Sequence, residues 1–200
     1  MKYELSRPRA VSIAVVLGSF FFLASRSSQA QQATFDLDPA KTTVTFTLGD
    51  VLHTVHGTFK AKTGHVTFDL ASGAASGGFV IDATSGDSGN HTRDRKMHKE
   101  ILESDKYPEI AFNPTKIVGK VATAGTSTVQ VEGKFRIHGS EHAMTLSVPV
   151  KVSGSALNAT LHFAVPYVDW GLKDPSNFVL RVSKEVEIDI FASGRYTAAP

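Results

Sequence analysis

Three histidines close together in the sequence are the first residues that could do chemistry. His53 and His56 are three positions apart, and His65 follows on what we expect to be the neighbouring strand. Imidazole nitrogens are common metal ligands, so a site built from these histidines is one hypothesis. In an extended strand, however, residues three apart face opposite sides, so His53 and His56 could chelate together only across a β-bulge. We therefore expect surface or hydrogen-bonded histidines and no bound metal.

Hydrolytic chemistry has weaker support. The sequence has no Gly-x-Ser-x-Gly motif, and residues 140–142 (Ser-Glu-His) crowd three polar side chains into an expected turn. A glycosidase-like mechanism needs two carboxyl groups that face each other across a cleft. The candidate acids lie instead at expected turns or on polar faces: Asp50, Asp69, Asp82 and Glu132. We expect no enzymatic activity, and a hydrolase built on a β-barrel remains an alternative.

The apolar residues form the strongest pattern, because they recur at every second position. Val44, Phe46 and Leu48 alternate with threonines, for example. This alternation is typical of antiparallel strands with one dry face and one wet face. The same pattern recurs in residues 66–70, 129–137, 146–152, 157–165 and 186–190.

These strands are separated by short Gly- and Ser-rich breaks in one continuous stretch, with no linker. Gly133 and Pro149 interrupt two strong strands, which indicates bulges, kinks or an edge in a sheet that curls on itself. The sequence therefore predicts an all-β fold, an antiparallel lipocalin-like β-barrel of about eight strands.

One segment departs from the alternation. Residues 93–104 are good helix formers, and Met97, Ile101 and Leu102 fall on one side of a helix. Asn90 or Thr92 could cap its start, and residues 107–108 (Tyr-Pro) stop it. We expect one short amphipathic helix over an opening or a wall of the barrel.

The expected interior is rich in phenylalanine, with 13 Phe against 1 Trp and 4 Tyr. An eight-stranded barrel is just wide enough to be filled by side chains or to hold one ligand. An apolar lining with few polar groups suits a long apolar lipid, and no other cofactor is expected. A packed barrel without a ligand, serving as a structural envelope protein, is the alternative. The residues expected to line a ligand site are Phe46, Leu48, Val55, Phe59, Phe68, Phe79, Ile81, Met97, Ile101, Phe112, Phe135, Leu146, Phe163 and Trp170.

The first thirty residues resemble a secretory signal peptide. Basic residues precede an apolar run over residues 11–24, and residues 28–30 (Ser-Gln-Ala) provide a small-x-small cleavage site. The run is shorter than the ~20 apolar residues that span a bilayer. We expect residues 1–30 to be removed by cleavage after Ala30, and the mature protein not to span a membrane as a helix.

Residues 31–200 have the length of one domain. Removing residues 1–30 changes the count from 21 basic and 19 acidic residues to 17 and 18, a net charge of about −1. Nucleic acid is thus an unexpected partner, because phosphate binding needs clustered basic charge. The absence of cysteine excludes disulfides, so packing alone must hold the domain. We expect a periplasmic or secreted protein, with a homodimer left open.

An outer-membrane barrel is a third class compatible with export and alternation. Such barrels are apolar outside and polar inside, with aromatic girdles at both interfaces. Here the aromatic residues are mostly Phe rather than Trp or Tyr, which argues against that arrangement.

Several short motifs occur in one order over about 160 residues: Phe35-Asp-Leu-Asp, His56-Gly-Thr-Phe, Gly64-His-Val-Thr-Phe, Ile81-Asp, Arg93-Asp, Lys106-Tyr-Pro-Glu-Ile and residues 131–139. As a set they resemble the YceI-like family. These proteins are lipocalin-like barrels of bacterial envelopes that bind polyisoprenoids and related lipids. The resemblance implies a periplasmic carrier of a polyisoprenoid, an isoprenoid quinone or a fatty-acid-like molecule. The chain departs from the family pattern at residues 101–105 and 167–171, two segments expected near the mouth.

Overall fold

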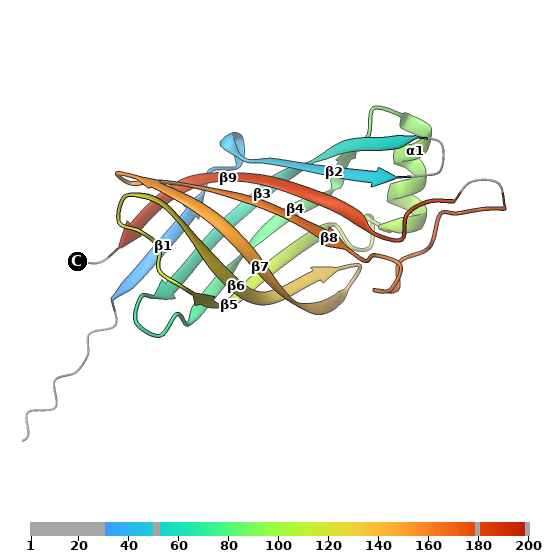
Figure 1. Cartoon of the computed structure of the whole chain (residues 1–200). Coiled ribbons are helices and arrows are strands. Elements are labelled where there is room, and N and C mark those ends of the chain that lie inside the picture. The colour runs from blue at the N-terminus through green and yellow to red at the C-terminus, as the bar shows by residue number, and fades with distance from the viewer. Residues whose placement is uncertain (1–30, 50–52, 179–180, 199–200) are drawn as a thin grey trace, which may run out of the picture.

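A computed structural model describes residues 31–49, 53–178 and 181–198, so the expected signal peptide lies outside the described residues. The described chain forms nine strands and one helical segment (Figure 1). The strands are β1 (Gln32–Leu37), β2 (Thr43–Gly49), β3 (Thr54–Asp69), β4 (Ala75–Asp87), β5 (Glu109–Val118), β6 (Gly125–Ile137), β7 (Ser140–Ser153), β8 (Ala156–Val165) and β9 (Val186–Ala198).

All strand pairs are antiparallel, and they close into a barrel. From β3 the neighbours run in chain order to β9, and β2 then pairs with both β9 and β3. Strand β1 occupies the same position as β2 farther along the barrel, because it also pairs with β3 and β9. A 3-10 turn (Pro39–Lys41), capped by Asp38, joins the two strands. Nine strands thus fill eight positions, which confirms the predicted barrel.

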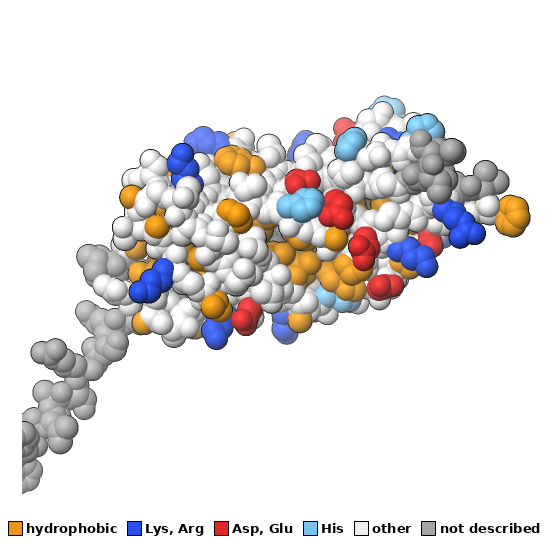
Figure 2. Space-filling view, in the orientation of Figure 1, with side chains coloured by type: hydrophobic (Ala, Val, Ile, Leu, Met, Phe, Trp, Pro, Cys, Tyr) orange, Lys and Arg blue, Asp and Glu red, His pale blue; other side chains and the backbone are white. Residues whose placement is uncertain are grey.

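Alternation places the apolar residues inside. In β6, for example, Val129 and Phe135 are buried, whereas Gln130, Glu132 and Lys134 are exposed. Figure 2 shows basic and acidic side chains spread over the visible outer face. This distribution is the reverse of the one that an outer-membrane barrel requires.

The helical segment is placed differently from the prediction at both ends. Helix α1 (His91–Lys96) begins two residues earlier than expected, and Asn90 caps it by accepting hydrogen bonds from the Thr92 and Arg93 N–H groups, both at 3.1 Å. A π-helical turn (Met97–Ile101) continues it and ends three residues early. The chain leaves the helix because Glu103 has a left-handed φ of 44°. No helix in the described part of the chain has the length and apolar character to cross a bilayer.

The two strand interruptions mark local departures from regular pairing. The β5–β6 register shifts between Pro114 and Lys116, opposite Gly133, and a Cβ atom on Gly133 would lie 2.6 Å from the Phe112 ring. The predicted bulge therefore lies in β5, the partner of the strand that contains Gly133. The absence of a side chain at Gly133 leaves room for the Phe112 ring. Pro149 lies where the β7–β8 pairing stops, since that pairing covers only Val150–Ser153.

Candidate functional site: two cavities inside the barrel

The barrel interior contains two cavities, one on each side of a shared ring of side chains. The distal cavity has a volume of about 160 Å³ and lies in the half of the barrel built with β1. The proximal cavity has about 540 Å³ and lies under α1. Five residues line both cavities, so the two cavities follow one another along the barrel. The shared residues are Ile81, Ile110, Phe135, Phe163 and Ile190.

The distal cavity is lined by apolar side chains, with Thr42 as its one polar lining residue. Three aromatic rings from β1, β3 and β4 contribute to the wall: the ring centres of Phe35 and Phe79 are 6.1 Å apart, and Phe68 also lines the cavity. These rings point inward because of the alternation of β1, β3 and β4. Such a lining offers an almost entirely hydrophobic contact surface.

The proximal cavity is roofed by the helical segment. Met97 and Ile101 line it from the π-helical turn. On the facing wall Phe46 and Phe59 pack with ring centres 5.4 Å apart. Gly57, paired with Phe46 across β2 and β3, makes this possible, because a Cβ atom there would lie 2.3 Å from the Phe46 ring.

Polar lining residues gather at one edge of the proximal cavity. Ser88, Asn90, Thr92, Arg93 and Lys96 all come from the segment that leads into and through α1. We call these five residues the polar rim.

A cluster of hydrogen bonds fixes the start of the polar rim. The Arg93 guanidinium donates to the Ser88 hydroxyl at 2.7 Å and to the Ser88 carbonyl at 2.8 Å. Asp94 accepts hydrogen bonds from the hydroxyl and the backbone N–H of the same serine. Burial raises the pKa of Asp94, but these bonds and nearby Arg93 outweigh it, so the pKa is lower than usual. Arg93 and Asp94 therefore hold Ser88 in place through its hydroxyl and backbone groups.

The long β8–β9 connection closes another side of the proximal cavity. Tyr167, Leu172, Pro175 and Val182 contribute lining atoms. The Tyr167 hydroxyl donates to the Ser183 carbonyl at 2.7 Å, which ties the two ends of this connection together. Burial raises the pKa of Tyr167 to about 12, so the hydroxyl keeps its proton at physiological pH.

Thirteen of the fourteen residues expected from the sequence line one or both cavities. The exception is Trp170, whose ring stacks on His142 at 4.1 Å and packs against Phe135 at 5.6 Å. Trp170 therefore packs against a lining residue without lining either cavity itself. It belongs to the irregular β8–β9 connection, where alternation gives no guide to the direction of a side chain. Contact of the thirteen with a ligand stays a prediction.

Several lining residues were missed by the sequence analysis. Some lie on the alternating phase of a strand, where the same signal could have found them; those on the β8–β9 connection had no periodic signal. The missed residues include Phe35, Leu37, Ile110, Val165, Tyr167, Leu172, Ile188 and Ile190.

The three histidines do not converge on one point. The His56 ring contacts the Thr47 hydroxyl at 3.1 Å, and the His65 ring contacts the Asp36 carboxylate at 2.6 Å. His53 is exposed. Within residues 31–49, 53–178 and 181–198, no three His, Asp or Glu side chains are grouped to hold a metal ion.

Two of the candidate hydrolytic acids, Asp69 and Asp82, accept hydrogen bonds from residues two or three positions away in the sequence. Residues 140–142 are not in a turn: they begin β7, because residues 138–139 make the turn. Asp69 and Asp82 accept hydrogen bonds from Ser72 and Thr84 groups, which lower the pKa of each carboxyl. Asp50 lies outside the described residues.

The chain is similar in sequence to bacterial proteins named UPF0312. A UPF0312 protein of Vibrio campbellii is 30% identical over 103 residues, which span 50% of this chain and only 52% of that protein. A UPF0312 protein of Pseudomonas putida is 29% identical over 150 residues, 70% of this chain and 73% of the relative.

Solved structures share the fold. The BcnA protein of Burkholderia cenocepacia superposes with a TM-score of 0.64 at 24% identity, covering 79% of this chain and 99% of BcnA. A domain from Saccharophagus degradans, described as polyisoprenoid binding and implicated in plant cell wall breakdown, gives 0.60 at 16% identity, covering 82% and 98%. The model of the YceI-like domain matches residues 35–193. The chain therefore belongs to the YceI-like family.

Proposed function

We propose that this protein binds one long apolar lipid inside its barrel and acts as a carrier or a store rather than an enzyme. The observation that carries the proposal is the pair of adjacent apolar cavities along the barrel. The proximal cavity alone, at about 540 Å³, falls within the ~300–1,000 Å³ typical of small-molecule sites. The candidate ligands are a polyisoprenoid, an isoprenoid quinone or a fatty-acid-like molecule.

Hydrophobic burial supplies enough free energy for such binding. A lipid that buries about twenty methylene-sized groups gains ~16 kcal/mol at ~0.8 kcal/mol per group. Ordering a flexible chain and restricting its motion cost roughly 4–15 kcal/mol. The surplus is compatible with micromolar or tighter binding, about −8 kcal/mol. No catalytic group is needed for this activity.

The Saccharophagus domain supports the isoprenoid class, since that protein is described as binding polyisoprenoids and has the same fold. Export to the periplasm is also part of the proposal, and it rests on the composition of residues 1–30.

A direct binding assay tests the function. Delipidated protein, titrated with an isoprenoid quinone, should bind one molecule per chain. Phe46→Asp should abolish binding, because an unpaired carboxylate in an apolar cavity is strongly disfavoured. Phe191→Asp is the matched control, since Phe191 is exposed on the outer face. Equal binding by both variants, or none by the native protein, would contradict the proposal.

A further inference from the structure

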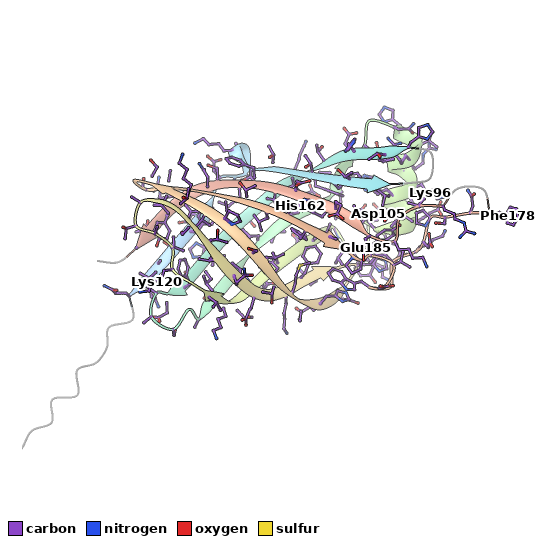
Figure 3. All side chains as sticks on the ribbon, in the orientation of Figure 1. Lys96, Asp105, Lys120, His162, Phe178 and Glu185 are labelled. Carbon is purple, nitrogen blue, oxygen red and sulfur yellow. The ribbon has the colours of Figure 1, made fainter. Side chains whose placement is uncertain are left out.

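The charged lining of the two cavities is confined to the polar rim. Arg93 and Lys96 are the two charged residues among the lining side chains that the structure describes, and both are cations. The remaining walls are almost entirely apolar. Figure 3 shows Lys96, the last residue of α1, at one end of the barrel. A ligand that fills the barrel would therefore meet positive charge at one end of its length.

Three acidic groups on the helical segment and on the β8–β9 connection, which both line the proximal cavity, have other partners. Asp94 accepts hydrogen bonds from Ser88. Glu100 pairs with Lys173 at 2.6 Å, and Asp174 accepts a hydrogen bond from the Ser176 N–H at 2.8 Å. None of these three carboxylates lines the cavity. The positive charge of the rim is thus not matched by an acidic lining residue.

The two rim cations differ in their freedom to bind a ligand. The Arg93 guanidinium donates hydrogen bonds to Ser88, and these bonds hold the local structure. Lys96 is exposed and lines the cavity, and no salt bridge joins it to another residue of the described part of the chain. The pKa of Glu100 is lowered mainly by Lys173, and the positive charge of Lys96 lowers it to a smaller extent. The Lys96 ammonium is therefore available at the mouth.

We infer that the lipid carries an anionic head group, a phosphate, diphosphate or carboxylate, and that Lys96 binds this head while the hydrocarbon chain occupies the two cavities. This inference rests on the proposed function. A compact ammonium with three donors suits oxygen anions, and Arg93 adds positive potential without leaving Ser88. The polar rim thus sets the direction in which the lipid enters, with its tail toward the distal cavity.

Because Lys96 is exposed, its contribution should be modest and sensitive to salt. We expect an anionic lipid to bind about tenfold more tightly than its neutral analogue, a difference of about 1.4 kcal/mol. This preference should shrink as the ionic strength rises, whereas the binding of the neutral analogue should not change in the same way.

The test compares farnesyl monophosphate with farnesol, which share one hydrocarbon chain. Dissociation constants are measured by calorimetry on the native protein, Lys96→Gln and Lys96→Glu. The matched controls are Lys99→Gln and Lys99→Glu, because Lys99 is exposed in the same helical segment but does not line a cavity. The Lys96 variants should lose the preference for the phosphate and keep the affinity for farnesol. The Lys99 variants should keep the preference.

Two outcomes would overturn the inference, and they are distinguishable. If the native protein binds both probes equally, or if the Lys99 variants lose the preference as much as the Lys96 variants do, the anionic head site is refuted and lipid binding stands. If neither probe binds, lipid binding fails as well. Circular dichroism and thermal unfolding of each variant establish that the barrel is intact.

Discussion

At the scale of single residues, the phenylalanines around the cavities can test whether the interior binds a ligand or is a packed core. Phe46, Phe59 and Phe163 line the proximal cavity, and Phe163 also lines the distal one. In a fully packed core each would be surrounded by protein on all sides. Here each ring has open space on one side, so part of its surface contributes little to stability in the empty protein.

Shortening these rings should affect the ligand more than the fold. Phe46→Ala, Phe59→Ala and Phe163→Ala should each lower the free energy of unfolding by less than the ~3–5 kcal/mol of a full Phe→Ala cavity. At least two of the three should retain less lipid. Urea unfolding of the empty protein and lipid retention are the measurements, with Phe191→Ala as the exposed control. Full cavity costs at all three positions, without loss of lipid, would indicate a packed core.

A second residue-scale prediction concerns pH. The Asp189 carboxylate accepts a hydrogen bond from the His162 ring at 2.8 Å across β8 and β9, and together with Glu187 it raises the pKa of His162 above 6.5. Because the folded pKa is raised, the pair stabilises the fold below pH ~6.5, and this contribution is lost as pH rises through the folded pKa. NMR titration should show a lower pKa in Asp189→Asn. The effect on stability should be small, since both groups are exposed.

At the scale of elements, β7 and β8 are paired over only part of their lengths. Their pairing covers only Val150–Ser153, so residues 140–149 of β7 run without β8 as a paired neighbour. Figure 1 shows the two strands diverging from their shared hairpin. Trp170, just after β8, stacks on His142 of β7 and so links the two edges by side-chain packing.

Removing that link should loosen the wall. Trp170→Ala should speed lipid release several-fold and lower the free energy of unfolding by about 2 kcal/mol, less than the ~3–5 kcal/mol of a fully buried Trp because the ring is half-buried. Trp170→Phe should largely restore both values. Release rates come from stopped-flow transfer of a fluorescent lipid to vesicles. An unchanged release rate in Trp170→Ala would show that this link does not limit release.

The strands could be predicted from the sequence better than their connections could. Alternation in β2, β3, β6 and β8 is a local signal, so it identifies inward residues such as Phe46 and Phe135 without knowledge of the fold. The position of Trp170 and the approach of Tyr167 to the cavity depend on how an irregular connection packs against distant strands. The sequence predicts the helix over an opening or a wall, but it does not show that the polar residues of the helix line the cavity, because that depends on how the closed barrel places α1.

At the scale of the whole molecule, the barrel is an apolar tube with positive charge at one end. Its two interior cavities follow one another, the helical segment roofs the proximal cavity, and the outer face carries both signs of charge. Such an interior can separate an apolar ligand from water, which is what the proposed carrier function requires.

Export should leave a defined N-terminus. If residues 1–30 act as a signal peptide, the mature protein begins at Gln31, because the small-x-small site ends at Ala30. N-terminal sequencing of protein from a periplasmic extract measures this. Ala30→Arg, which makes the site unreadable by the peptidase, should leave the uncleaved chain in the membrane fraction. Recovery of the intact chain from the cytoplasm would contradict export.

The central claim is that the barrel holds a lipid, and native mass spectrometry of protein purified under mild conditions from its own cells tests it most directly. We expect a species heavier than the mature chain by one lipid, which organic solvent removes and which Phe46→Asp lacks. A native protein that carries no added mass, with an extract that contains no stoichiometric lipid, would contradict the claim.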